Sequence, residues 1–291
     1  MHMYCRWTVI LFFLIQACNQ PGSGERTRDM FTGRGLQGAD AEASEVIYSL
    51  YLPTDISRLL EETGTNFMPG LLLPPEKIPL YENPEQIAQL LGALGVDMSY
   101  CRLFERIPES AEYYTQIELL ADKLDLPDRI FEKYSRNLEE YFSEPDSLTG
   151  LIHTVYRETD SYFRENGMES LASLSLMGGW IEAMYIGAEI YMDKGIIEMG
   201  NRILQQKYAL NSLVGLLGNF QESLLVRKNM HILNELREMY DHVEIRYAPE
   251  GFRIHPEEGK FHASASEIRY NTGTLQSICT RIISIRGEII Q

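Results

Sequence analysis

Two acidic residues of this chain lie in apolar surroundings, where a carboxyl group can take part in chemistry. Asp97 stands between Val96 and Met98, and Glu182 lies within the most apolar stretch of the sequence. A buried carboxylate is costly unless it is paired or hydrogen-bonded, and burial shifts its pKa. Such groups can bind a cation or a small ligand, or act as a general acid and base.

Combining these acids with nearby aromatic residues predicts a candidate ligand pocket. Its members are acidic or aromatic residues on three expected helices, namely Asp97, Tyr100, Asp160, Trp180, Glu182 and Tyr185. A structural interpretation competes with this one. In it, the same acids cap helices or bond between them, with tyrosine hydroxyls or Arg102, Arg157 and Arg164 as partners. We rank the structural interpretation first, ligand binding second and catalysis third.

Motifs that carry known chemistry are missing from the sequence. It has no phosphate-binding glycine loop with Lys-Ser/Thr, no HExxH, no GxSxG and no CxxC. No histidine stands three residues after a glutamate, the spacing that a di-iron bundle needs. Glu238 and His242 are four apart and are better explained as a surface pair. We therefore predict no catalytic residue, no metal site and no cofactor, and lean towards a protein that is not an enzyme.

Cys18 offers chemistry of another kind. The segment Leu14-Ile15-Gln16-Ala17-Cys18 follows a short apolar run with Arg6 before it, which is typical of a secretory signal peptide. The segment resembles the lipobox of bacterial lipoproteins, apart from Gln16, where a small or aliphatic residue is usual. The resemblance implies cleavage before Cys18 and acylation of its thiol, whereas plain secretion with an unmodified cysteine is the alternative. Several acyl chains anchor a protein far better than one.

The sequence changes character directly after Cys18. Residues 18–45 are rich in glycine and polar residues and have few large apolar ones, so they cannot bury enough surface to fold. We expect a signal peptide at 1–17, a flexible tether at 18–45 and one folded domain at 46–291. No acid follows Cys18 until Glu25, so an acidic surface-export signal is missing. We therefore expect a lipid-anchored protein of the bacterial cell envelope, on the periplasmic side of the outer membrane.

The folded domain is expected to be all-α, because its apolar residues recur with a period near 3.6. We predict an antiparallel multi-helix bundle or stacked helical hairpins. The apolar helix at 169–192 should be central, since it is apolar nearly all round. Short alternating stretches between 243 and 270 predict a small extended segment. The predicted helices lie at 55–62, 84–104, 110–124, 129–142, 145–166, 169–192, 198–220, 223–240 and 274–290.

Cys101 and Cys279 are the cysteines left in this domain, and both stand among apolar residues at helical spacing. Pairing is possible in an oxidising compartment, but two cysteines do not make a disulfide framework. We expect two separate buried thiols.

Several segments of the domain resemble a group of uncharacterised helical lipoproteins of Bacteroidota. They are Gly95–Tyr100, Leu120–Leu124, Asp146–Leu148, Glu158–Tyr162 and Gly178–Tyr185. The resemblance covers roughly Val46 to the C-terminus and implies an all-helical body behind a lipid anchor. It implies no activity.

Charge narrows the choice of partners. The chain of 291 residues has a net charge of −16, which disfavours nucleic acid and an electrostatic hold on anionic lipid. The expected membrane contact is therefore the lipid on Cys18. We predict a non-enzymatic envelope protein that binds or scaffolds a protein partner. The alternative is a periplasmic module that binds a small molecule or peptide in the acidic-aromatic pocket.

Overall fold

The computed structural model describes residues 65–131, 145–255 and 260–290, and it confirms the all-α fold. Helices pack against one another around a continuous hydrophobic core, and the extended segment is a two-stranded antiparallel sheet. The predicted signal peptide, lipobox, tether and first helix lie outside the described residues, as does most of the helix expected at 129–142.

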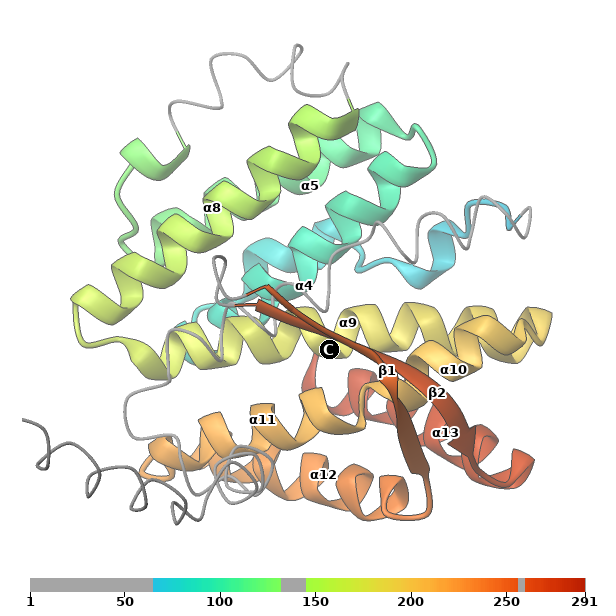
Figure 1. Ribbon diagram of the computed structural model, residues 1–291. Coiled ribbons are helices and arrows are strands. Elements are labelled where there is room, and N and C mark those ends of the chain that lie inside the picture. Colours follow the sequence, from blue (N-terminus) through green and yellow to red (C-terminus); the bar gives the residue numbers. More distant parts are fainter. Residues whose placement is uncertain (1–64, 132–144, 256–259, 291) are drawn as a thin grey trace, which may run out of the picture. The chain divides into compact units, whose positions relative to one another are not determined.

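Helix α9, Glu169–Lys194, is the central element. It contacts α4 (Pro84–Leu103) most extensively, and it also contacts α8 (Pro145–Glu165), α10 (Ile197–Gln205), α11 (Lys207–Leu217) and α13 (Thr272–Ile289). Figure 1 shows α9 running through the middle of these helices. Its buried side chains lie on all sides of the helix, as the sequence predicted.

Glycines let α4 and α9 approach backbone to backbone. A Cβ on Gly92 would lie 1.8 Å from Ser175 O, and one on Gly178 would lie 1.9 Å from Gln89 O. Real Cβ atoms do not come that close, so both positions need glycine. This contact fixes how the two helices sit against each other along their length.

Some helices begin at a residue whose side chain caps the first turn, whereas α9, α10 and α11 begin without such a hydrogen bond. Asn83 accepts hydrogen bonds from the backbone N–H groups of Glu85 and Gln86 before α4. Ser223 caps α12 (Leu224–Tyr240) and Asn271 caps α13 in the same way. Helix α5, Ile107–Lys123, starts earlier than expected, with Pro108 inside its first turn, where proline is tolerated. Before α4, Pro69–Leu71 and Pro75–Leu80 form two short 3-10 helices, η1 and η2.

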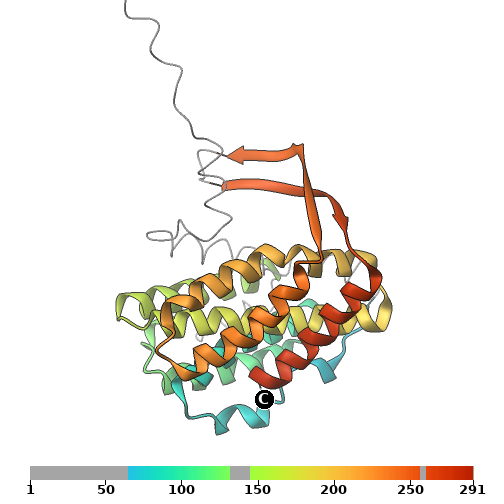
Figure 2. The ribbon, with the colours of Figure 1, turned by 90° about the horizontal axis from the view of Figure 1, so that it is seen from below.

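The single helix expected at 198–220 is divided. Helix α10 ends at Gln205, α11 begins at Lys207, and a 3-10 turn, η3, covers Gly218–Phe220. The break lets α10 contact α9 and the sheet, while α11 contacts α9 and α12. Figure 2 shows the orange α12 lying beside the red α13.

The extended segment lies where the sequence predicted it, and its two strands are longer than the short alternating stretches expected there. Strand β1, Glu244–His255, pairs with β2, Lys260–Arg269, in one antiparallel hairpin. The register shifts between Arg246 and Phe252, which marks an irregularity in β1. Alternating stretches that the sequence shows separately at 243–247 and 252–254 therefore belong to one strand, β1.

The two cysteines of the domain are separate, buried thiols, as expected. Within the described part of the chain, no helix combines the length and the apolar character needed to cross a membrane.

The glycine contact between α4 and α9 can be tested by one substitution. Gly92→Ala places a methyl group against the Ser175 carbonyl, so we expect it to lower the free energy of unfolding by about 1–3 kcal/mol. Denaturant unfolding followed by circular dichroism measures the change.

Gly287→Ala is the matched control. Nothing lies within 4 Å of a Cβ at this helical position, and alanine favours a helix over glycine by up to about 1 kcal/mol. The control variant should therefore be as stable as the parent or more so. Equal effects of the two substitutions would contradict the proposed close contact.

Candidate functional site

The structure brings two of the predicted acids together in the core. Asp97 on α4 and Glu182 on α9 are both fully buried, with 0% of each residue exposed. The close helix contact at Gly92 and Gly178 places them near each other, and the electrostatic field of Glu182 acts directly on Asp97. We call Asp97, Glu182 and their partner Arg286 the buried acid cluster.

Arg286, in the last turn of α13, neutralises Glu182. Its Nε donates to Glu182 Oε2 at 3.0 Å, and its Nη2 donates to Oε1 at 3.1 Å. This two-pronged geometry is the strong form of an Arg–carboxylate pair. The guanidinium also lies over the ring of Tyr185, 4.7 Å from the ring centroid, in a cation–π contact.

Asp97 is held by the segment that precedes α4. The backbone N–H of Leu73 donates to Asp97 Oδ2 at 3.0 Å. The Tyr113 hydroxyl donates to the carbonyl of the same Leu73 at 2.7 Å, which fixes this stretch of backbone against α5. The buried acid cluster thus joins α4, α9, α13 and the segment before α4.

Burial changes the acidity of both carboxyl groups. Desolvation raises the pKa of Asp97 well above its usual value, and the neighbouring Glu182 raises it further. Desolvation also raises the pKa of Glu182, but the Arg286 charge opposes that effect. Burial and the neighbouring charges therefore favour protonation of Asp97 more strongly than protonation of Glu182.

The other predicted site residues take separate roles. Tyr185 contacts the buried acid cluster through Arg286. The hydroxyl of Tyr100 accepts a hydrogen bond from Met68 N at 3.2 Å, and its ring packs on Phe67 and Phe104. Trp180 is buried in the core with 1% exposed.

Asp160 has no electrostatic effect on Asp97 or Glu182 among the causes that shift their pKa values. It forms an ion pair with Arg164, one turn further along α8, at 2.8 Å. The expected partner Arg164 was thus correct for Asp160, and this pairing follows the structural interpretation.

Sequence reasoning missed Arg286. It is 104 residues from Glu182, and no charged residue of the helix expected at 274–290 was singled out from the sequence. A usable signal did exist, because Arg286 follows the apolar positions Ile278, Ile282 and Ile285 on a helix with few charges. A basic residue next to the buried apolar positions of a helix lies where it can pair with a buried acid of another helix.

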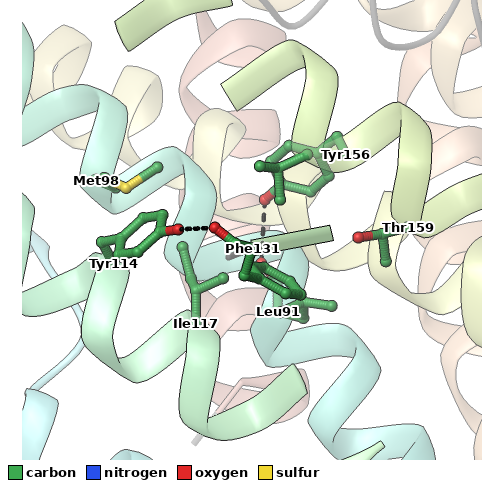
Figure 3. A pocket seen from close by; sticks show the side chains of 8 residues that line it. Leu91, Met98, Tyr114, Ile117, Phe131, Tyr156 and Thr159 are labelled. Atoms are coloured by element: carbon green, nitrogen blue, oxygen red, sulfur yellow. Dashed lines mark hydrogen bonds between the residues drawn. The ribbon is translucent and has the colours of Figure 1, made fainter. Parts of the chain in front are cut away.

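A small cavity lies elsewhere in the core, between α4, α5 and α8. It measures about 20 Å³, and its lining is almost wholly apolar. Figure 3 shows the Tyr114 hydroxyl directed at the Phe131 carbonyl and the Tyr156 hydroxyl directed at the α4 backbone. None of the six predicted pocket residues lines it. A space of that size holds about one water molecule, so it does not suit an organic ligand.

The geometry of the buried acid cluster suits a cross-link rather than a reaction centre. Its carboxyl groups have no exposed surface through which a substrate would reach them. Among the described residues, no group of three histidine, cysteine or acidic side chains is arranged to hold a metal ion. The arrangement therefore supports the structural interpretation of these acids over ligand binding and catalysis.

Comparison with known proteins adds no family. No protein-family model matches the chain, no curated protein is significantly similar to its sequence, and no solved structure is significantly similar to its fold.

Removing the charge of Glu182 should be costly. Glu182→Gln leaves the Arg286 guanidinium, 16% exposed, without its counter-charge. Breaking a buried pair in this way costs about 3–5 kcal/mol, which chemical denaturation would measure.

Glu235→Gln is the control, since Glu235 pairs with Arg281 at the surface, with 47% and 22% of the two side chains exposed. Exposed pairs contribute about 0–1 kcal/mol. A second test replaces both partners, as Glu182→Leu with Arg286→Met, and should cost less than Glu182→Gln alone. If Glu182→Gln costs no more than Glu235→Gln, the cluster does not hold the helices together.

Proposed function

We propose that this chain is a lipid-anchored protein of the bacterial cell envelope, whose helical domain binds or scaffolds a protein partner and catalyses no reaction. The observation that carries the proposal is the lipobox-like segment Leu14–Cys18 behind a short apolar run. Acylation of Cys18 would hold the domain at a membrane through residues 18–45.

The charge of the chain supports a covalent anchor. A protein with a net charge of −16 is repelled by anionic lipid headgroups, so it gains little from lying on a bilayer. Lipid chains supply the membrane affinity that the protein surface lacks. The domain would then stand away from the bilayer and face other proteins of the envelope.

The interior of the domain supports a binding role over catalysis. The buried acids are occupied with Arg286 and the Leu73 backbone, and the small cavity is apolar. The interior described by the structure thus favours neither a bound small molecule nor a reaction. Recognition would then take place on the outer surface.

The β1–β2 hairpin is a suitable element for such recognition. In the described part of the chain, the sheet consists of these two strands, so each of them is an edge strand. Edges of this kind accept an added strand from another protein. The strands have 12 and 10 residues, which is long enough for a stable addition.

The anchor is tested by substituting Cys18. Cys18→Ala should abolish incorporation of a fatty-acid analogue and leave an unprocessed precursor, because the acylated thiol is the reaction site. Metabolic labelling and gel mobility in the bacterial host measure both.

Cys5→Ala is the matched control, since Cys5 lies ahead of the apolar run and is removed with the signal peptide. It should be labelled and processed as the parent is. Unchanged labelling of the Cys18→Ala variant would refute the anchor.

The partner is tested by affinity purification of the full chain from native membranes. We expect the parent protein to recover the same envelope protein reproducibly. A variant lacking the hairpin strands, with residues 246–267 replaced by a short glycine linker, should lose it while keeping the helical circular dichroism signal. Recovery of no reproducible partner would count against the binding role.

A further inference from the structure

The hydrogen bonds of the buried acid cluster leave one oxygen without a donor. Arg286 serves both oxygens of Glu182, and the Leu73 N–H serves Asp97 Oδ2. Asp97 Oδ1 receives no N–H or O–H from the described residues, although it is buried. The Asp97 side chain interacts with the Glu182 carboxyl group, and two carboxyl groups can hydrogen-bond only when one of them carries a proton.

The count of charges leads to the same conclusion. Two carboxyl groups and one guanidinium occupy a space in which both acids are 0% exposed. With both acids ionised, this space would hold an uncompensated negative charge, which is costly away from water. One proton makes the cluster neutral and supplies the missing hydrogen bond.

We propose that Asp97 and Glu182 share one proton, and that this proton makes the contact between the C-terminal part of α4 and α9 sensitive to pH. Asp97 donates the proton from Oδ1 to Glu182, and Glu182 stays ionised against Arg286. This proposal does not depend on the proposed lipid anchor.

Opening of the contact should be favoured by raising the pH. The packed state holds a proton that the opened, hydrated carboxyl pair releases, because solvated acids have pKa values near 4. Above the ordinary range of aspartate, each further pH unit therefore favours the open state until Asp97 ionises in the packed state too. Buried carboxyl groups in proteins reach pKa values of up to about 8–9.

Other titratable groups around Asp97 and Glu182 do not account for an opening of the α4–α9 contact between the usual pKa of aspartate and about pH 9. Burial raises the pKa of every tyrosine that faces the cluster, so each stays neutral beyond its usual range. Burial also raises the pKa of the Cys101 thiol, to about 12. Arg286 stays charged. The groups concerned come from the segment before α4, from α4, α5, α8, α9 and α13, and are Tyr81, Cys101, Tyr113, Tyr156, Tyr185 and Arg286.

The part of α4 that opens is set by the glycine contact. Gly92 fixes the middle of α4 against α9, so movement is limited to the end beyond it, Asp97–Leu103, and to the Leu73 backbone. Cys101 lies in this end, one turn after Asp97, and is buried. Cys279 on α13 is equally buried and has its pKa raised to about 12 by the same cause. The two thiols form a matched reporter and reference.

The test is alkylation of the full chain by N-ethylmaleimide, with each thiol quantified by peptide mass spectrometry between about pH 5 and pH 9. The ratio of Cys101 to Cys279 labelling cancels the effect of pH on thiol ionisation. It should rise with pH by up to about tenfold per unit, because opening releases one proton. Ionised Asp97 raises the pKa of the Cys101 thiol, so a rise does not come from activation of the thiol.

Asp97→Asn is the deciding variant. Its amide N–H₂ replaces the shared proton and donates to Glu182, while its oxygen accepts from Leu73 N–H. The ratio should then be independent of pH. A ratio that does not change with pH in the parent, or that rises equally in Asp97→Asn, would overturn the proposal.

An infrared measurement on the parent protein does not depend on any variant folding. At neutral pH the exposed acids are ionised, so a carbonyl band of a protonated carboxylic acid, shifted in deuterated water, reports a buried one. We expect this band near pH 7 and its loss at alkaline pH. Its absence at neutral pH would show that no proton is shared.

Discussion

The close contact of α4 with α9 is the constraint on which the rest of the domain depends. Gly92 and Gly178 let the two backbones touch, and this contact sets where Asp97 and Glu182 meet further along the helices. Once these carboxyl groups are buried, they require a cation and a donor. Arg286 of α13 and the Leu73 backbone supply them. The glycine contact between α4 and α9 thereby determines where α13 and the segment around Leu73 must pack.

Local signals in the sequence were sufficient to predict most of the helices and the burial of two acids, Asp97 and Glu182. The period of apolar residues predicted α4, α8, α9 and α12, and the unusual burial of Asp97 and Glu182 followed from their neighbours. The pairing of Arg286 with Glu182 could not be predicted, because a spacing of 104 residues carries no periodic signal, although the position of Arg286 beside apolar residues of α13 marked it as a candidate partner for a buried acid. Asp160 was grouped with the wrong acids, since its ion pair with Arg164 within α8 satisfies it locally.

The same chemistry explains why an acidic-aromatic set of residues need not form a ligand site. Tyrosine and tryptophan pack their rings in a core and offer a polar tip. Here Tyr113 and Tyr100 use their hydroxyls on the backbone of the segment before α4, and Tyr185 lies under Arg286. Each aromatic residue supports a structural contact of an acid or of the chain around it. The types of residue alone do not distinguish a ligand site from a set of structural contacts in the core.

The charge of the whole chain adds to the argument for a shared proton. With 42 acidic and 26 basic residues, the average field around the domain is negative, and a negative field favours protonated carboxyl groups. Salt screens the exposed charges within about 10 Å but affects buried groups much less. The proton on Asp97 therefore depends chiefly on Glu182 and Arg286 beside it, while the acidic surface adds a smaller, salt-dependent preference in the same direction. Lowering the ionic strength would strengthen that preference, and the contact between α4 and α9 would then stay closed to a higher pH.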